Sequence, residues 1–482
     1  GSSTFGPADR RHNFLKFSAA WEFSKLFVPN FINFGKLRFA YGQAGDEPNV
    51  YAIFSGYRSP SLFSAGEKVN LGLTYNGVTG YRSDDEVSNF RIRPERRHEY
   101  ELGADISLFD GSMGISTTIY NAINNDVIYN VDVTPSTGAD EMTANGASIG
   151  NKGIEFTIDY RAIDTEKLKW DSKLIYASNK NSVLEMNGIT GSMAKLMSED
   201  LVPSRGIAKF SEVSPGREYA EFKVLSWARF GYGMVVDHDL NINTPDVNID
   251  TLKDYSWSKN DVYVAKNGLP IMYSQKIWSG YAPNPDWTGS FFNELSIGRK
   301  LKISCLIDIS IGGHIANYTK NALYEWGTHA DTDKRYHPDF DNPNWHGYQE
   351  GVSTNWGKGT FQELLNHNHK SIGPGQDTII TYSQNFYENY MGRNTDVINN
   401  IEDASYAKLR ELSLSYNFGK INNSYLGNPG VIVRLSAQDL ITWTKYSGWD
   451  PETNMYQDRI SGEDYFNQPQ TWRANLALQL NW

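Results

Sequence analysis

Apolar and polar residues alternate with a period of two along many separate stretches of this sequence. Residues 97–109 place apolar side chains at 100, 102, 104, 106 and 108, between polar or small residues. The C-terminal stretch 471–482 repeats the pattern, and its apolar positions include Leu476, Leu478, Leu480 and Trp482. This is the period of a β-strand that has one apolar and one polar face. The sequence therefore predicts an all-β fold and argues against a mainly helical one.

The same alternation predicts a series of antiparallel strands. We expect strands near residues 12–23, 34–43, 97–109, 112–124, 153–163, 168–180, 286–299, 301–312, 404–418, 431–441 and 471–482. Residues 220–232 could add one more. Asp110 and Gly111 both tolerate positive φ, so this pair predicts a tight hairpin. Short turns are also expected at 164–167 and 299–300.

The other connections are long, and they alternate with the short turns. They comprise residues 44–96, 125–152, 181–285, 313–403 and 442–470. Long extracellular loops on one side and short periplasmic turns on the other are typical of an outer-membrane β-barrel. With Asp110-Gly111 at the periplasmic side, the last strand also ends at that side.

Composition is compatible with a membrane barrel. Mean hydropathy is −0.52 and no apolar run approaches the roughly 18 residues of a membrane helix. Only every second residue of a barrel strand faces lipid, so such a chain looks polar on average. A net charge of −11 argues against a nucleic-acid partner. Cys305 is the one cysteine, which excludes an internal disulfide.

The expected fold is thus an antiparallel transmembrane β-barrel segment of about 11–14 strands. A free-standing segment would leave two strand edges unpaired in lipid, at several kcal/mol for each unsatisfied group. We therefore expect partner strands, or a longer chain of which 1–482 is part. Residues 1–6 are polar and show no signal peptide. Residue 1 is therefore not expected to be the biological start, and Gly1-Ser2-Ser3 as a cloning remnant is the alternative.

Six blocks in order along the chain resemble one known family. They are FGKLRFAYGQAG at 34–45, PERRHEYELGAD at 94–105, NKGIE at 151–155, PDWTG at 285–289 with Gly312-Gly313, AKLRELSLSY at 407–416 and TWTKYSGWDPE at 442–452. These blocks resemble those of the SusC/RagA family of TonB-dependent outer-membrane transporters. From the residues alone, Asn151-Lys152-Gly153 and Asp450-Pro451-Glu452 are read as turn chemistry, with Gly153 just before a strand.

The resemblance implies a 22-stranded barrel, of which residues 1–482 would be roughly the C-terminal half. It also implies a plug domain, a TonB box and early strands N-terminal to residue 1, which this sequence does not contain. Implied partners are a SusD-like lipoprotein lid, the TonB complex, the barrel-assembly machinery and outer-membrane lipid, with a dimer of the paired complex as a further expectation. The implied activity is import of oligosaccharides or peptides across the bacterial outer membrane. The pattern Leu476, Leu478, Leu480 and Trp482 resembles the C-terminal signal read during barrel assembly; a lipid-facing strand with interfacial Trp anchors is the alternative, and both can hold at once.

Aromatic residues in the long loops are the candidate cargo contacts, because flat rings stack on sugars and on peptide side chains. The candidates are Trp326, Trp345, Tyr348, Trp356, Tyr387 and Tyr390. Packing of the loops, or of a lid against them, is an equally strong interpretation. The Asp-rich and His-rich segment 329–350 lacks both the calcium-loop order and a zinc spacing, so no metal or other cofactor is expected and calcium is the alternative.

No catalytic motif stands in a recognisable setting, so we expect no enzyme; an outer-membrane phospholipase is the enzymatic competitor. Two non-enzymatic alternatives to the importer are open. One is a SusC-like barrel that serves as the scaffold of a larger surface complex. The other is a soluble all-β binding protein, which fails if the strands share one apolar outer band about 25 Å tall.

Overall fold

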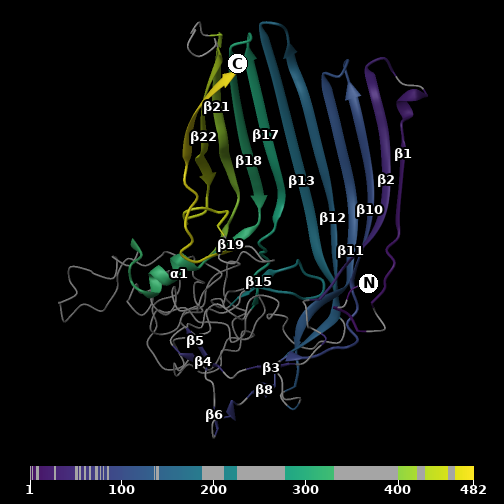
Figure 1. The fold of residues 1–482 in the computed structure, drawn as a ribbon, viewed down its shortest axis with the longest axis vertical. Helices are drawn as coiled ribbons and strands as arrows, with labels where there is room; N and C mark the ends of the chain where they lie inside the picture. The colour runs from purple at the N-terminus through teal and green to yellow at the C-terminus, as the bar shows by residue number, and fades with distance from the viewer. Residues whose placement is uncertain are drawn as a thin grey trace, which may run out of the picture.

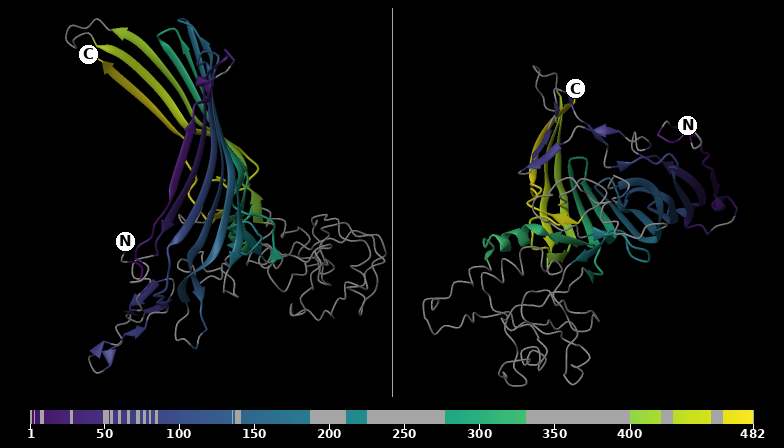
Figure 2. Two further views of the ribbon diagram at one scale, coloured as in Figure 1. Left: turned by 90° about the vertical axis from the view of Figure 1, so that its right-hand side faces the viewer. Right: turned by 90° about the horizontal axis from the view of Figure 1, so that it is seen from below.

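A computed structural model shows how these strands are arranged. It describes residues 2, 4–6, 10–26, 29–48, 86–134, 136, 141–186, 211–224, 277–330, 400–420, 429–453 and 462–481, with short stretches between 53 and 83. One large, strongly curved sheet dominates the described part, and the short elements gather at one end of it (Figures 1 and 2).

The large sheet is antiparallel along its whole path. In spatial order its strands are β1 (Lys16–Trp21), β2 (Ile32–Asp46), β10 (Glu95–Leu108), β11 (Met113–Asp132), β12 (Glu141–Asp164), β13 (Leu168–Met186), β17 (Pro285–Ile297), β18 (Leu301–Gly312), β21 (Tyr406–Lys420), β22 (Gly430–Thr444) and β24 (Arg473–Asn481). Each wall strand pairs with the wall strands that come before and after it in the sequence, as in an up-and-down barrel wall. The short β9 (Glu86–Val87) joins β12 in parallel.

Smaller elements surround this wall. A 3₁₀ turn (Phe23–Lys25) follows β1. The other elements are β3 (Tyr57–Arg58), β4 (Ser61–Ser64), β5 (Glu67–Asn70), β6 (Thr74–Tyr75), β7 (Val78–Thr79), β8 (Arg82–Ser83), β14 (Ser211–Glu212), β15 (Glu221–Val224), β16 (Ile277–Trp278), β19 (His314–Asn317), α1 (Tyr318–Glu325), β20 (Ile401–Asp403) and β23 (Glu463–Asp464). Two three-stranded sheets form among them, β14-β15-β16 and β20-β19-β23.

The two ends of the sheet differ as the sequence predicts. At the end drawn uppermost in Figure 1, hereafter the turn end, short connections join β10 to β11, β12 to β13 and β17 to β18. Asp110 and Gly111 have φ of 54° and 81°, which confirms the predicted hairpin. Asn481 pairs with Gly430 at this same end. The opposite end, hereafter the loop end, carries α1 and the small sheets (Figure 1).

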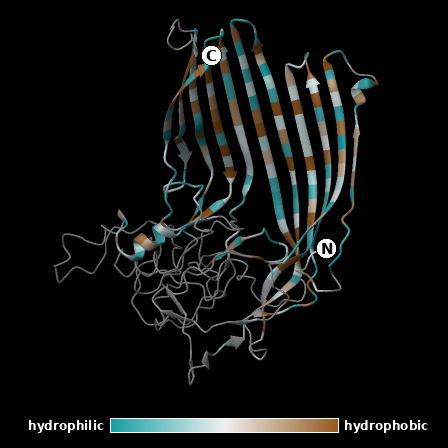
Figure 3. Cartoon of the chain, in the orientation of Figure 1, coloured by the Kyte–Doolittle hydropathy of each residue, from teal (hydrophilic) through white to brown (hydrophobic). Residues whose placement is uncertain are grey.

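Strand register aligns apolar residues of these strands in continuous rows on one side, the outer face. One row of cross-strand partners reads Gly35, Ile106, Ile115, Ile158, Leu174, Phe291, Ile307, Leu409 and Ile441. A second row links Ile303, Leu414, Leu435 and Leu476. The large side chains of these rows are exposed or only partly buried, and brown bands cross the strands in Figure 3. A surface this apolar fits lipid and contradicts a soluble binding protein.

Two expected boundaries were wrong at the loop end. Strand β11 continues to Asp132 and β12 begins at Glu141, so the long connection expected at 125–152 shrinks to residues 133–140. Asn151-Lys152-Gly153 therefore lies inside β12 and is not a turn. The register shifts near Val127, where Asn145 donates to the carbonyls of Asp126 and Arg93 and holds the extended hairpin in place.

The expected strand at 220–232 does not belong to the wall. Its described part, β15, pairs with β14 and β16, and residues 225–232 lie outside the described residues. The expected first strand, 12–23, is shorter than predicted. Pairing with β2 holds Lys16–Trp21 in β1, and the chain then enters the 3₁₀ turn.

Substitutions at two adjacent residues of β13 would show which face of the wall contacts lipid. Leu174 lies on the outer face and Ile175 on the inner face, with 41% and 40% of their surfaces exposed. We expect Leu174→Arg to destabilise the barrel by about 2–4 kcal/mol, because it places a guanidinium near the middle of the bilayer. Ile175→Arg is the matched control and should cost much less. Denaturant unfolding of the full-length protein in lipid bilayers measures both, and equal losses would contradict the assigned faces.

Candidate functional site

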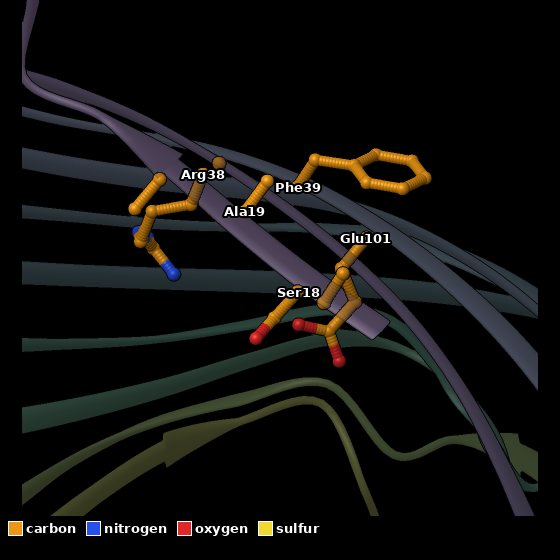
Figure 4. Close-up of a pocket in the computed structure, with 8 residues that line it drawn as sticks. Ser18, Ala19, Arg38, Phe39 and Glu101 are labelled. Carbon is orange, nitrogen blue, oxygen red and sulfur yellow. The ribbon is translucent and has the colours of Figure 1, made fainter. Parts of the chain in front are cut away.

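The inner face of the wall is polar, and its side chains bind one another across strands. On β2, Lys36 and Arg38 both reach Asp105 of β10, with Lys36 Nζ 3.0 Å from Oδ2 and Arg38 Nη2 3.0 Å from Oδ1. The Ser116 hydroxyl donates to the same carboxylate at 2.8 Å. Figure 4 shows Arg38 and Glu101 on the side of β2 that faces the rest of the sheet, and Phe39 on the opposite side. A hollow of about 220 Å³ lies here, with small side chains of β1 and β2 among its lining.

Two glycines allow inner-face side chains to cross a whole strand. Arg38 on β2 lies over Gly103 on β10 and donates to Thr118 Oγ1 on β11 at 3.2 Å. Tyr120 on β11 lies over Gly153 on β12 and donates to Asn179 Oδ1 on β13 at 3.0 Å. A Cβ would stand 2.8 Å from Arg38 Cζ at Gly103.

The same crossing explains Gly153. A Cβ there would stand 2.6 Å from Tyr120 Oη and would also collide with the Ser178 carbonyl oxygen. Both glycines belong to sequence blocks named above. Each glycine lets one side chain pass over its strand and bind the strand beyond, so that three strands are joined. The interpretation of Gly153 as part of a turn does not account for this role.

A network of ion pairs joins the wall to the connection that follows β22. Lys408 on β21 is only 2% exposed, and its Nζ lies 2.7 Å from Asp450 Oδ1 and 2.5 Å from Glu452 Oε2. Arg410 binds Glu452 as well, and it reaches Asp308 Oδ2 on β18 at 2.8 Å and Asp439 Oδ1 on β22 at 3.1 Å. The connection is therefore fixed by charge to β21, and Arg410 extends the network to β18 and β22.

Glu452 is ionised because of this network. Burial alone would raise the pKa of its carboxyl, but hydrogen bonds from Arg410, Lys408 and Tyr406 outweigh burial and lower the pKa to about 2. A carboxyl whose pKa is lowered by folding stabilises the folded state above its unfolded pKa. That contribution is complete above about pH 4.5 and is lost as the pH falls toward 2.

Asp450-Pro451-Glu452 does form a turn, since the Thr453 amide donates to the Asp450 carbonyl at 3.1 Å. The carboxylates of Asp450 and Glu452 also form ion pairs with Lys408 and Arg410 of β21, a role that the sequence interpretation missed. The available signal was the pair of cations in 407–416, an otherwise apolar-alternating strand that needs counter-charges.

The short elements at the loop end form a second layer that is joined by hydrogen bonds and ion pairs. Asn317 caps α1 by accepting from the Lys320 amide at 2.9 Å. Lys320 Nζ pairs with Glu402 Oε1 at 2.9 Å, and Glu402 also accepts from the amide and hydroxyl of Ser447. Burial raises the pKa of Glu402, yet the bonds from Ser447 and Lys320 prevail and lower it. The carboxylate is thereby kept charged, and it ties α1, β20 and the segment after β22 together.

Two exposed aromatic rings lie on this layer. Trp326 caps the C-terminus of α1 and stacks on Phe466, with ring centroids 5.4 Å apart and planes 10° apart. They remain 50% and 46% exposed. Phe466 has a φ of 53°, unusual for a residue with a side chain, and its amide donates to Thr319 Oγ1 at 2.6 Å. The pair is therefore held in place by the backbone below it.

Metal ligands and helical spans were searched over the described ranges. Among those residues, no group of three or more His, Cys, Asp or Glu side chains is arranged to hold a metal ion. Within the same part of the chain, no helix has the length and apolarity needed to cross a bilayer. The acidic segment 331–350 lies outside the described residues.

Sequence comparison places this wall in a known group. Residues 2–200 match the family described as "TonB dependent receptor-like, beta-barrel". The whole chain aligns with TonB-dependent receptor P3 of Formosa agariphila at 24% identity, over 43% of that protein. SusC of Bacteroides thetaiotaomicron is 23% identical over 39% of this chain and 19% of SusC. Residues 2–200 therefore match the β-barrel of the TonB-dependent receptor family, and the whole chain is similar to receptor P3, which bears that family's name.

Solved structures agree on the fold of this TonB-dependent receptor barrel. A chain of the RagAB peptide importer in its open-open state superimposes on all of the chain with a TM-score of 0.64, at 16% identity. The closed-closed state gives 0.60 over 99% of it. The present chain spans 44% of those chains and 43% of receptor P3, less than half the length of either.

The predicted site residues divide into described and undescribed ones. Trp326 is exposed at the loop end, and its contact with cargo stays a prediction. The other five loop aromatics, Trp345, Tyr348, Trp356, Tyr387 and Tyr390, lie outside the described residues. Leu476 and Leu478 are exposed on the outer face of β24 and Leu480 is partly buried, whereas Trp482 is outside the described part.

Gly153 offers a direct test of the crossing side chains. We expect Gly153→Ala to destabilise the receptor barrel by about 1–3 kcal/mol, because the new methyl group overpacks Tyr120 and the backbone of Ser178. Gly114→Ala is the control, since its Cβ would meet nothing nearer than 3.8 Å. Unfolding midpoints of the two variants in bilayers decide the matter, and a neutral Gly153→Ala would refute the crossing.

Lys408→Met tests the ion network. Removing a buried cation leaves the carboxylates of Asp450 and Glu452 uncompensated, which typically costs about 3–5 kcal/mol. We expect faster hydrogen exchange at the amides of 445–453 and a lower unfolding midpoint. Lys445→Met removes an exposed lysine of the same segment and should change neither. Unaltered exchange in Lys408→Met would show that the segment is held by other contacts.

Proposed function

We propose that this barrel is part of an outer-membrane importer that takes up oligosaccharides or peptides together with a SusD-like lipoprotein lid. The observation that carries the proposal is the likeness to RagAB along the entire chain, named a peptide importer, combined with the ordered SusC-type blocks. The polar inner wall supports it, because a hydrated lumen is what a passage for polar cargo requires.

The loop end supplies the features expected of a capture surface. Its base is rigid, since Lys408, Arg410 and Glu402 fix the connecting segments by ion pairs. On that base Trp326 and Phe466 present ring surface to solvent. We propose that this surface contacts the cargo or the lid, together with the loop aromatics at 345, 348, 356, 387 and 390.

Import through TonB would need further parts of the protein, because this chain spans less than half the length of receptor P3. We propose that a plug domain, a TonB-interacting segment and further strands precede this chain in the complete protein, and that energy arrives through TonB. The outer-face leucines of β24, with Trp482, would serve as the signal for barrel assembly. The complete protein would reside in the bacterial outer membrane, as its family does, and dimerise as a lidded pair.

Uptake by intact cells tests the proposal. We expect cells with the full-length protein and its lipoprotein partner to accumulate fluorescent oligosaccharides or peptides, and an uncoupler of the inner membrane to abolish this, because TonB depends on the proton gradient. Trp326→Ala should lower uptake or retention of the partner severalfold, roughly the loss from removing one stacked ring. Trp449→Ala, which removes a ring that is 76% exposed, is the control.

The contrary result is equally specific. Intact mass and N-terminal sequencing of the protein from isolated outer membranes give its real extent. A protein with no plug peptides and no co-purifying strands, in cells whose uptake ignores the uncoupler, would contradict import. It would favour a SusC-like barrel that acts as the scaffold of a surface complex.

A further inference from the structure

Two lysines face each other directly on the outer side of the wall. Lys152 of β12 and Lys180 of β13 are register partners. Both share the outer face, because Ile154 lies two residues from Lys152 on the same strand and belongs to the apolar band. Like charges directly opposite each other destabilise a sheet, so this arrangement needs an explanation.

The two ammonium groups have no counter-charge among the described residues. Both lysines are exposed, and no carboxylate of the described part lies within ion-pair distance of either. Lys180 feels the charge of Glu218 only from farther away. Inner-face lysines are different: Lys173 pairs with Asp159 at 3.1 Å and Lys302 with Glu294 at 2.7 Å.

The lysines stand at the border of the apolar band. Their row of register partners reads Tyr41, Tyr100, Asn121, Lys152 and Lys180. The next row toward the turn end reads Phe39, Leu102, Ile119, Ile154 and Ser178, and its first four residues are apolar. The rings of Tyr41 and Tyr100 contact each other in the border row, with centroids 4.8 Å apart, and Tyr is enriched at the interface of membrane and water.

More polar donors accompany the lysines along this border. Asn121 is the cross-strand neighbour of Lys152, and its side-chain amide can donate. Toward the loop end, Arg96 of β10 pairs with Gly45 and Asn125, and its exposed guanidinium has no carboxylate partner among the described residues. The border therefore carries several unneutralised cations although the whole chain is acidic, at −11.

We propose that Lys152 and Lys180 bind the phosphate of a lipid head group in the outer leaflet of the membrane. The phosphate would lie between the two ammonium groups with Asn121 at its side, and the acyl chains would lie along Ile154 and Ile119. An anion in this place converts a repulsive pair into two attractive contacts. The site depends on the barrel being embedded in a bilayer, and it is independent of any cargo.

Lipid retention by the full-length protein tests the site. The protein is placed in nanodiscs of phosphatidylcholine that contain a small fraction of lipid A, and bound lipid is counted by native mass spectrometry. We expect Lys152→Gln with Lys180→Gln to weaken lipid A binding roughly tenfold or more, since each lysine at an anionic surface contributes about a factor of five. Lys152→Arg with Lys180→Arg should preserve binding.

Controls separate this site from general charge effects. Lys167→Gln with Lys300→Gln removes the same charge at the turn end and should leave binding unchanged. The wild-type protein should lose binding to dephosphorylated lipid A, a result that needs no variant to fold. Inorganic phosphate should not compete, since it has no acyl chains to lie on the apolar band. Equal retention by the glutamine variant and its control, or of lipid A with and without phosphate, would overturn the proposal.

Discussion

Cross-strand register is the constraint on which the rest of this structure depends. Side chains alternate between the faces of a strand, so a slip of one residue would exchange the apolar and polar faces. Here the register carries a single apolar row from Gly35 to Ile441, across bulges in β21 and β22. Lipid on the outside enforces it, because a slipped strand would put charge into hydrocarbon. Every inner-face contact follows from that alignment.

The inner face converts the alignment into specific contacts. Arg38 and Tyr120 each cross a neighbouring strand because the residue below them is glycine, and each ends at a partner on the strand beyond. At the loop end, Lys408 and Arg410 bind the connection that follows β22, whereas Arg38 and Tyr120 bind a further strand. Backbone hydrogen bonds between strands thus hold the wall together. The polar side chains of Arg38 and Tyr120 add contacts that form only when three strands are in register.

Sequence reasoning succeeded where the signal was local. Alternation located the wall strands, and the hairpin residues Asp110 and Gly111 located a turn, since both depend on neighbours in sequence. It failed at Gly153, because a glycine beside asparagine and lysine suggests a turn unless Tyr120, far along the chain, is known to lie over it. It also missed the Lys408 network, whose partners are more than forty residues away. The predicted contact of Trp326 with cargo stays a prediction, and its stacking on Phe466 joins segments too distant in sequence to be foreseen.

The wall and the layer at the loop end are stabilised by different means. The wall depends on register and lipid, which tolerate little change. The layer at the loop end is attached to the wall by ion pairs. Carboxylates such as Glu402, Asp450 and Glu452 bind cations that lie on strands or on α1. Substitutions in the intervening loops leave those anchors intact, because ion pairs at the loop bases do not depend on what lies between them. A barrel built this way can alter the surface at its loop end without disturbing the register that lets it fold.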